Sequence, residues 1–164
     1  MTVIVHRIPA TAYGVLPECP YGVVRLSPAE LASDAVAMLL NRLSADADGF
    51  TPVALHGQSV GSRDGAGRTT HAWAALRMDD TIVAVIGLHE ADVEGGRRYS
   101  IPWLLVDPRE RRRRVATGLV RTALAAAVEA GATEVVVETL ARWTAASAFW
   151  TRIVERTTWA ASSP

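Results

Sequence analysis

The stretch that most constrains the fold is residues 99–130, where a strand, a short turn and a helix follow one another directly. Residues 100–106 are nearly all apolar, which is typical of a strand covered on both faces. Asp107 and Pro108 interrupt this run, and apolar residues then recur at helical spacing up to Gly131, where a helix would end. This order favours an α/β protein built around a sheet.

Five arginines surround the predicted start of this helix: Arg109, Arg111, Arg112, Arg113 and Arg114. A helix that begins directly after a strand presents unpaired backbone N–H groups and the positive end of its dipole. Such a helix start binds phosphate groups readily. The alternative for the arginines is a solvated surface without a specific ligand.

Pro102 lies inside the predicted strand. Proline removes a donor from the ladder and is tolerated mainly at edges or bulges. A bulge here would leave nearby backbone N–H and C=O groups free to bind a ligand.

Residues 106–108, followed by 111–116 and Leu119, resemble the acyl-CoA signature of the GNAT superfamily of N-acetyltransferases. That family's loop reads Gln/Arg-x-x-Gly-x-Gly/Ala, and Arg111 and Ala116 match its first and last fixed positions. At the middle position, where glycine lets the backbone approach the pyrophosphate, this chain has Arg114. The resemblance covers residues 21–154. It implies an α/β (α+β) fold with a mixed, mostly antiparallel sheet flanked by helices, a β-bulge in the central strand and a splayed parallel pair.

The resemblance also implies acetyl-CoA, or another acyl-CoA, as co-substrate and no metal. The pantetheine arm would lie beside residues 104–106 and the pyrophosphate on the amides of residues 111–116. The N–H of Leu104 would hold the thioester carbonyl and stabilise the oxyanion. The implied binding residues are Leu104, Leu105, Val106, Arg111, Arg112, Arg113, Arg114, Val115, Ala116, Thr117 and Trp143.

Catalytic groups depart from the family pattern. The family often places a glutamate or histidine where this chain has Ser100, so the general base is sought at His89, Glu90 or Glu138, each of which could instead be an ordinary surface residue. Trp150 occupies the place of a tyrosine that protonates the leaving thiolate, and indole can donate only a hydrogen bond. Alternatively, Phe149 and Trp150 are core aromatics. The implied catalytic residues are Leu104, Trp150, Glu138, His89 and Ser100.

The chain is expected to comprise an N-terminal extension, residues 1–20, with a short strand, and a GNAT-like domain, residues 21–164. Ser27 and Glu30 predict a helix start. The further expected elements are a strand at 21–26, a helix from Ser27 to Leu43, an acceptor wall within 44–69 by resemblance, a hairpin of 71–77 and 81–88, a parallel strand at 134–140 and a helix at 143–154.

The C-terminal end is shorter than the family pattern, because residues 156–160 leave room for one further strand at most. Either the sheet is truncated, or the N-terminal strand or a partner chain covers its edge.

Composition narrows the class of protein. The 164 residues carry zero formal net charge, so the arginine cluster is local, which disfavours a nucleic-acid-binding protein. The single cysteine and the lack of a signal-peptide pattern point to the cytoplasm, and no apolar stretch approaches the ~20 residues of a membrane span. The expected partner is a small-molecule or peptide amine in a bacterial cell, with a homodimer left open.

Two functions follow from this reading. The first is an N-acetyltransferase that moves an acetyl group from acetyl-CoA to a primary amine by direct attack. The second is a degenerate GNAT-fold module that binds acyl-CoA with little or no transfer, which the departures at Ser100, Arg114 and Trp150 would explain. A dinucleotide-binding fold is disfavoured because no G-x-G-x-x-G follows any strand.

Overall fold

The computed structural model describes residues 2–31, 33–34, 36, 38, 41–42 and 67–164. These residues form one seven-stranded sheet in the order β1-β7-β5-β4-β3-β2, with β6 also paired to β4. The strands are β1 (Val3–Pro9), β2 (Gly22–Arg25), β3 (Arg68–Leu76), β4 (Ile82–Val93), β5 (Gly96–Ser100), β6 (Leu104–Val106) and β7 (Glu134–Leu140). The helices are α1 (Pro28–Leu31), α4 (Val115–Glu129) and α5 (Thr144–Ser162), with 3-10 turns η1 (Ala10–Val15) and η2 (Pro108–Glu110).

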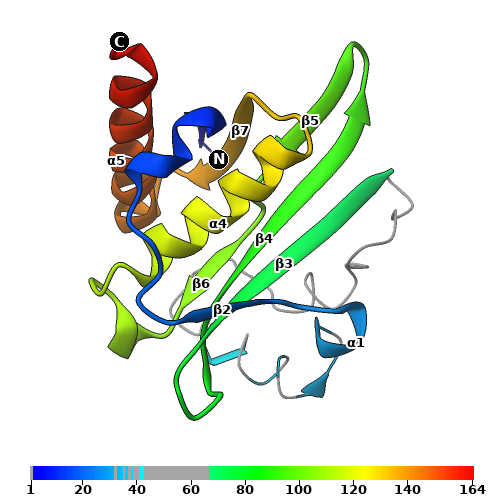
Figure 1. Cartoon of the computed structure of the whole chain (residues 1–164), viewed down its shortest axis with the longest axis vertical. Coiled ribbons are helices and arrows are strands. Elements are labelled where there is room, and N and C mark those ends of the chain that lie inside the picture. The colour runs from blue at the N-terminus through cyan, green and yellow to red at the C-terminus, as the bar shows by residue number, and fades with distance from the viewer. Residues whose placement is uncertain (1, 32, 35, 37, 39–40, 43–66) are drawn as a thin grey trace.

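The expected mixed, mostly antiparallel sheet is confirmed. All strand pairs are antiparallel except β5 and β7, which run parallel. Figure 1 shows α4 crossing one face of the sheet, with α5 at its flank. Within the described residues, no helix is both long enough and apolar enough to pass through a membrane.

Two apolar clusters fill the two faces of the sheet. The larger packs α4, α5 and η1 against the strands and includes Ile8, Leu119 and Trp150. The smaller lies on the opposite face and includes Leu26, Val36 and Trp103. On β3, Trp73 and Ala75 lie in the larger cluster and Ala72 and Ala74 in the smaller, as the pleat of a strand requires.

The predicted strand of residues 100–106 is interrupted beside Pro102. It divides into β5 and β6, and the predicted bulge is confirmed by the register. His89 pairs with Ser100 and Ile86 with Leu104, so three steps along β4 oppose four steps on the other side. One extra residue is therefore accommodated at the proline.

The N-terminal signals are also confirmed where the structure describes them. Ser27 and Glu30 form a reciprocal capping box, with Ser27 N–H donating to Glu30 Oε2 at 2.7 Å and Glu30 N–H donating to Ser27 Oγ at 3.2 Å. The predicted hairpin is that of β3 and β4. The expected acceptor wall at residues 44–66 and the helix end at Leu43 lie outside the described residues.

The expected end of the chain is wrong in one respect. The last helix does not end at Val154 but continues to Ser162, so residues 156–160, which had room for one strand at most, are helical. Thr157 is fully buried on the core side, and its hydroxyl donates to the Ile153 carbonyl at 2.8 Å. This packing overrides the β-propensity of the local sequence.

The edge of β7 is covered by β1. The two strands are antiparallel over their whole length, from Val3 opposite Leu140 to Pro9 opposite Glu134. Of the alternatives for completing the sheet, the N-terminal strand is therefore the one realised. The extension at residues 1–20 is an integral part of the sheet and the core, to which it contributes Ile8 and Leu16.

Candidate functional site

The strand β6 has an open edge. Among the residues that the structure describes, β6 pairs only with β4, whereas β5 pairs with β7 at a single register position, Ser100 opposite Val136. Beyond Ile101, whose N–H donates to the Val136 carbonyl at 3.0 Å, the ladder between the central strand and β7 stops. This is the splayed parallel pair that the resemblance implied.

Backbone alternation shows which groups face the opening. Gly87 N–H donates to the Trp103 carbonyl at 3.1 Å, and Asp107 N–H donates to the Val83 carbonyl at 2.8 Å. Residues 103, 105 and 107 therefore direct their backbone groups to β4. Leu104 and Val106, which alternate with them, direct theirs toward the opening beside β7.

The start of α4 supplies a second set of open amides. The first i to i−4 backbone hydrogen bond of α4 runs from Gly118 N–H to the Arg114 carbonyl at 2.9 Å. The N–H groups of Val115, Ala116 and Thr117 precede it and have no acceptor within the helix. They form, with the helix dipole, an anion-binding end that begins nine residues after β6.

The arginine turn adopts a conformation that glycine would favour. Arg112 and Arg114 both have φ of 63°, in the left-handed region. Arg114 is the N-terminal cap of α4 and occupies the position at which the family signature has glycine. The left-handed backbone is thus present at this position, although the residue is an arginine with a charged side chain and not a glycine.

Two buried carboxylates anchor this turn. Asp107 Oδ1 accepts from Arg109 N–H at 3.0 Å, and its Oδ2 lies 3.2 Å from Arg42 Nη2. Glu110 is fully buried: its Oε2 accepts from the Tyr21 hydroxyl at 2.7 Å and from Arg113 Nη1 at 3.4 Å.

The other oxygen of Glu110, Oε1, pairs with Arg77 after β3. Hydrogen bonds from Arg77 and then Tyr21 hold the pKa of the Glu110 carboxyl below its ordinary value. Sequence reasoning missed this residue. The available signal was a single acid within a run of five arginines, since a lone carboxylate there has cations on both sides.

Three of the predicted catalytic residues share one face of the sheet. His89 lies opposite Ser100, and Ser100 lies opposite Val136, so Glu138, two residues further along β7, projects from the same face. Glu138 Oε1 lies 3.8 Å from Arg98 Nη2, and its side chain is largely exposed. The structure thus brings together a histidine, a serine and a carboxylate beside the open edge.

The remaining predicted residues are placed apart from that face. Glu90 projects from the other face, where it pairs with His71 and Arg97. Trp150 is buried in the larger core cluster, with its ring centroid 5.0 Å from that of Phe149 in an edge-to-face arrangement. Trp143 directly precedes α5, and its N–H donates to the Leu140 carbonyl at 2.9 Å.

Trp103 was not predicted as a site residue, yet it lies beside the open edge. Its indole covers Gly87, where an added Cβ would come within 2.5 Å of Trp103 Cε2. Gly87 and His89 are two positions apart on β4 and therefore lie on the same face. The indole that covers Gly87 thus lies on the face shared by His89, Ser100 and Glu138. The lack of a side chain at Gly87 makes room for this ring.

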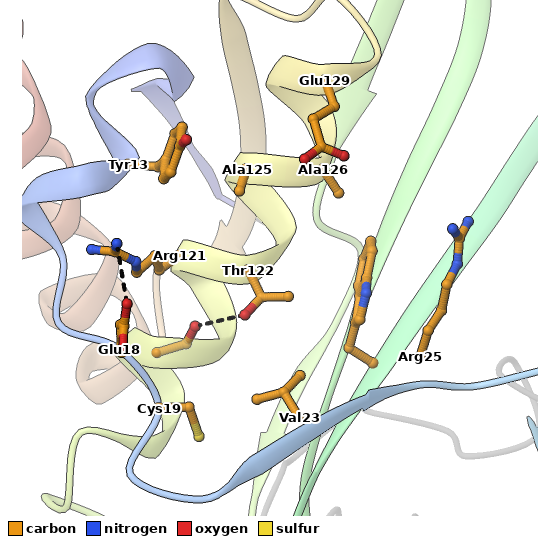
Figure 2. Close-up of a pocket in the computed structure, with 12 residues that line it drawn as sticks. Tyr13, Glu18, Cys19, Val23, Arg25, Arg121, Thr122, Ala125, Ala126 and Glu129 are labelled. Atoms are coloured by element: carbon orange, nitrogen blue, oxygen red, sulfur yellow. Dashed lines mark hydrogen bonds and ion pairs between the residues drawn. The ribbon is translucent and has the colours of Figure 1, made fainter.

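A cavity of about 540 Å³ lies elsewhere, between α4, β2 and the segment after η1 (Figure 2). Arg121 lies in its wall. Its Nη1 donates to the Gly14 and Leu16 carbonyls, and its Nη2 lies 3.6 Å from Glu18 Oε1. Burial raises the pKa of the half-buried Cys19 thiol in its wall. None of the predicted site residues lines this cavity, so cavity size alone does not locate the candidate site.

No three histidine, cysteine, aspartate or glutamate side chains among the described residues are grouped to hold a metal ion. The described groups beside the open edge are backbone amides, arginines, His89, Ser100 and Glu138.

Comparison with known proteins agrees with this geometry. The model of the acetyltransferase (GNAT) family matches residues 40–154 of the chain. No curated protein matches the sequence. Solved structures of low sequence identity share the fold.

Three of these structures illustrate the range. An aminoglycoside acetyltransferase from an uncultured soil metagenomic sample has 22% identity and a TM-score of 0.59, covering 80% of this chain and 89% of its own. A ribosomal-protein-alanine N-acetyltransferase from Brucella melitensis biovar Abortus 2308 has 17% identity and a TM-score of 0.59, and the match covers 81% of this chain and 91% of that protein. A functionally unknown conserved protein from Staphylococcus epidermidis ATCC 12228 has 11% identity and a TM-score of 0.64. The match covers 92% of this chain but only 55% of that longer protein.

Proposed function

Because the chain belongs to the GNAT acetyltransferase family, we propose that it transfers an acetyl group from acetyl-CoA to a primary amine of a small molecule or a peptide. The observation that carries this proposal is the continuity of two sets of open backbone amides. The open edge of β6 leads through the arginine turn directly to the unpaired amides at the start of α4. The first set can pair with an amide-containing arm, and the second can bind a diphosphate.

The residues present fit such a ligand. Leu104 and Val106 offer N–H and C=O groups that can pair with the amides of the pantetheine arm, as an added strand would. Val115, Ala116 and Thr117 offer N–H groups for the diphosphate, with Arg111, Arg112, Arg113 and Arg114 supplying positive charge around them. Trp143 and Leu105 are the remaining proposed contacts.

In the reaction, the amine nitrogen attacks the thioester carbonyl carbon, the C–S bond breaks and coenzyme A leaves as a thiolate. Leu104 N–H is proposed to donate to the carbonyl oxygen as its negative charge develops. Acetyl-CoA supplies both the acyl group and a leaving group whose thiol pKa is about 8.5, so departure needs little acid assistance.

The acceptor must lose a proton, since an amine with a pKa of about 10.4 is mostly protonated at neutral pH, at a cost of about 4–5 kcal/mol. Glu138 and His89 are the proposed proton acceptors, because a carboxylate and an imidazole can each take up a proton and both residues share the face of Ser100. The Ser100 hydroxyl can orient the amine but cannot accept its proton at neutral pH. Trp150 is proposed to support the thiol side of the site by packing only.

A specific observation also supports the alternative, an acyl-CoA-binding module with little transfer. Trp150 replaces the family's acid and is buried among core side chains, and Ser100 replaces its base. In that case the amide-lined surface would be retained while turnover was lost.

Ligand binding and turnover separate these functions. We expect acetyl-CoA to raise the melting temperature of the protein. Release of free thiol should then be followed over a panel of primary amines that includes aminoglycosides and peptides with an N-terminal alanine. Stabilisation without thiol release for any amine would favour the binding module, and the absence of any stabilisation would contradict both functions.

The substitution Leu104→Pro tests the proposed backbone contact. Proline removes the Leu104 N–H, which faces the opening, while the bonds of Trp103 and Asp107 to β4 remain. We expect the loss of one oxyanion donor to lower kcat by about 10²–10³-fold. Leu104→Ala keeps the N–H and is the matched control. Equal turnover of the two variants, both folded by circular dichroism, would exclude this role for the amide.

A further inference from the structure

The helix α5 uses only one side for the core. Trp150, Ile153 and Thr157 are its buried residues. Figure 1 shows the helix at the flank of the molecule, with the sheet and α4 on its inner side. The opposite side carries exposed residues at alternating intervals of three and four positions: Ala145, Ala148, Arg152, Glu155, Trp159 and Ser162.

This spacing is the one by which two helices pack along a common seam. We call these six residues the α5 seam. Trp159 is 74% exposed, which is unusual for a large aromatic side chain. Glu155 and then Arg152 precede Trp159 on the seam. Neither forms an ion pair or hydrogen bond with any other described residue.

The α5 seam is complementary to itself when a second copy runs antiparallel. If a two-fold axis passes midway between Arg152 and Glu155, Arg152 of each chain lies opposite Glu155 of the other. The same axis places Trp159 over Ala148 and Ala145 over Ser162, each twice. Opposite charges therefore meet at the centre, and the largest side chain meets a small one at each end.

The parallel arrangement lacks this complementarity. In it, Arg152 would lie opposite Arg152 and Trp159 opposite Trp159, so that like charges repel and the two large rings compete for the same space. A self-complementary surface of this kind is what a two-fold symmetric interface requires.

We propose that the α5 seam is a two-fold, antiparallel interface with a second copy of this chain. The interface is centred on the reciprocal Arg152–Glu155 pairs. No residue of the α5 seam is among those proposed to bind acetyl-CoA or to take part in transfer, so the interface is tested separately from the proposed function. Because one helix pair buries little surface, the association is weak and depends on protein concentration.

The test is sedimentation velocity over a concentration series, with charge reversals at the seam centre. The wild type should change from monomer to dimer as concentration rises. Arg152→Glu places two glutamates opposite each other, and Glu155→Arg places two arginines opposite each other, so each variant alone should raise the dimer dissociation constant at least ~10-fold. Trp159→Ala should also weaken the dimer.

Two combinations make the geometry specific. The double variant Arg152→Glu with Glu155→Arg restores opposite charges and should dimerise like the wild type. A mixture of the two single variants should form a heterodimer, since every pair across the axis is again Glu with Arg. Glu94→Arg, at the exposed turn between β4 and β5, is the control for a change in net charge and should dimerise normally.

The proposal is overturned by a wild type that stays monomeric at its highest soluble concentration. It is equally overturned if the single reversals dimerise as well as the wild type, or if the mixture forms no heterodimer. Every substituted side chain is exposed, so each variant is expected to fold, and circular dichroism with thermal unfolding checks this.

Discussion

The left-handed backbone at Arg114 makes a prediction about stability that separates conformation from charge. Arg114 has φ of 63° and ψ of 10°, a region that costs an L-residue about 1–2 kcal/mol and costs glycine little. Glycine loses more chain entropy on folding, by about 0.5–1 kcal/mol. The net result is that Arg114→Gly should be more stable than Arg114→Ala by about 0.5–1 kcal/mol.

This comparison is made between two variants that both lack the arginine charge. For a chain of this length, the difference corresponds to a melting temperature about 1–4 °C higher for Arg114→Gly than for Arg114→Ala. Differential scanning calorimetry or chemical denaturation measures it. Arg112, which has the same φ of 63°, should show the same order of glycine above alanine.

Arg111 is the matched control, because its φ of −63° and ψ of 150° are ordinary for any residue. There the order should reverse, with Arg111→Ala at least as stable as Arg111→Gly. If Arg114→Gly is no more stable than Arg114→Ala, the backbone argument for the missing family glycine is refuted. A titration with acetyl-CoA on the same variants then measures how much the lost charge contributes to binding.

Two further predictions concern the surroundings of the site. Gly87→Ala should destabilise the fold by about 1–3 kcal/mol, because the added Cβ would lie 2.5 Å from the Trp103 ring, whereas Gly22→Ala, with no atom within 4 Å of its Cβ, should be close to neutral in chemical denaturation. Glu110→Gln should lower stability most at neutral pH. The lowered pKa of Glu110 means that its contribution is present above its ordinary pKa and is lost as pH falls through the lowered one, so wild type and variant should converge in acid-denaturation curves. A constant difference at all pH values would contradict that assignment.

Local signals in the sequence predicted much of the fold. Pro102 marked the break between β5 and β6, Ser27 and Glu30 marked a capping box, and Gly131, with φ of 100°, marked the end of α4. Each of these depends on the backbone preference of one residue or on a contact within a few positions. Such signals can be read without knowledge of the rest of the chain.

The features that were missed depend on long-range contacts. A β-branched run at residues 2–8 predicts a strand, but nothing within it specifies β7 as its neighbour. Residues 156–160 continue α5, and the burial of Thr157 against the core is a contact that the local sequence does not specify. Glu110 lies among charged residues in the sequence, which indicates an exposed position. It is buried, because Arg77 and Tyr21 contact its carboxylate from other elements.

For the candidate site, the sequence predicted the arginine turn and the open strand but could not rank the proton acceptors. His89, Glu90 and Glu138 are equivalent as residue types. Only strand alternation and register separate Glu90, on the other face, from the pair beside Ser100.

The pairing of β1 with β7 has a consequence for how the chain acquires its structure. Among the described strands, β1 stands earliest in the sequence and pairs with β7, which stands latest; His6 and Thr139, bonded at 3.0 Å, are 133 positions apart. Closing so long a loop is entropically costly, so the hairpins of β3, β4 and β5 should form earlier and β1 should dock late. Until β7 has been synthesised, β1 lacks its partner strand, and a nascent chain would depend on chaperones or rapid completion to avoid mispairing of β1.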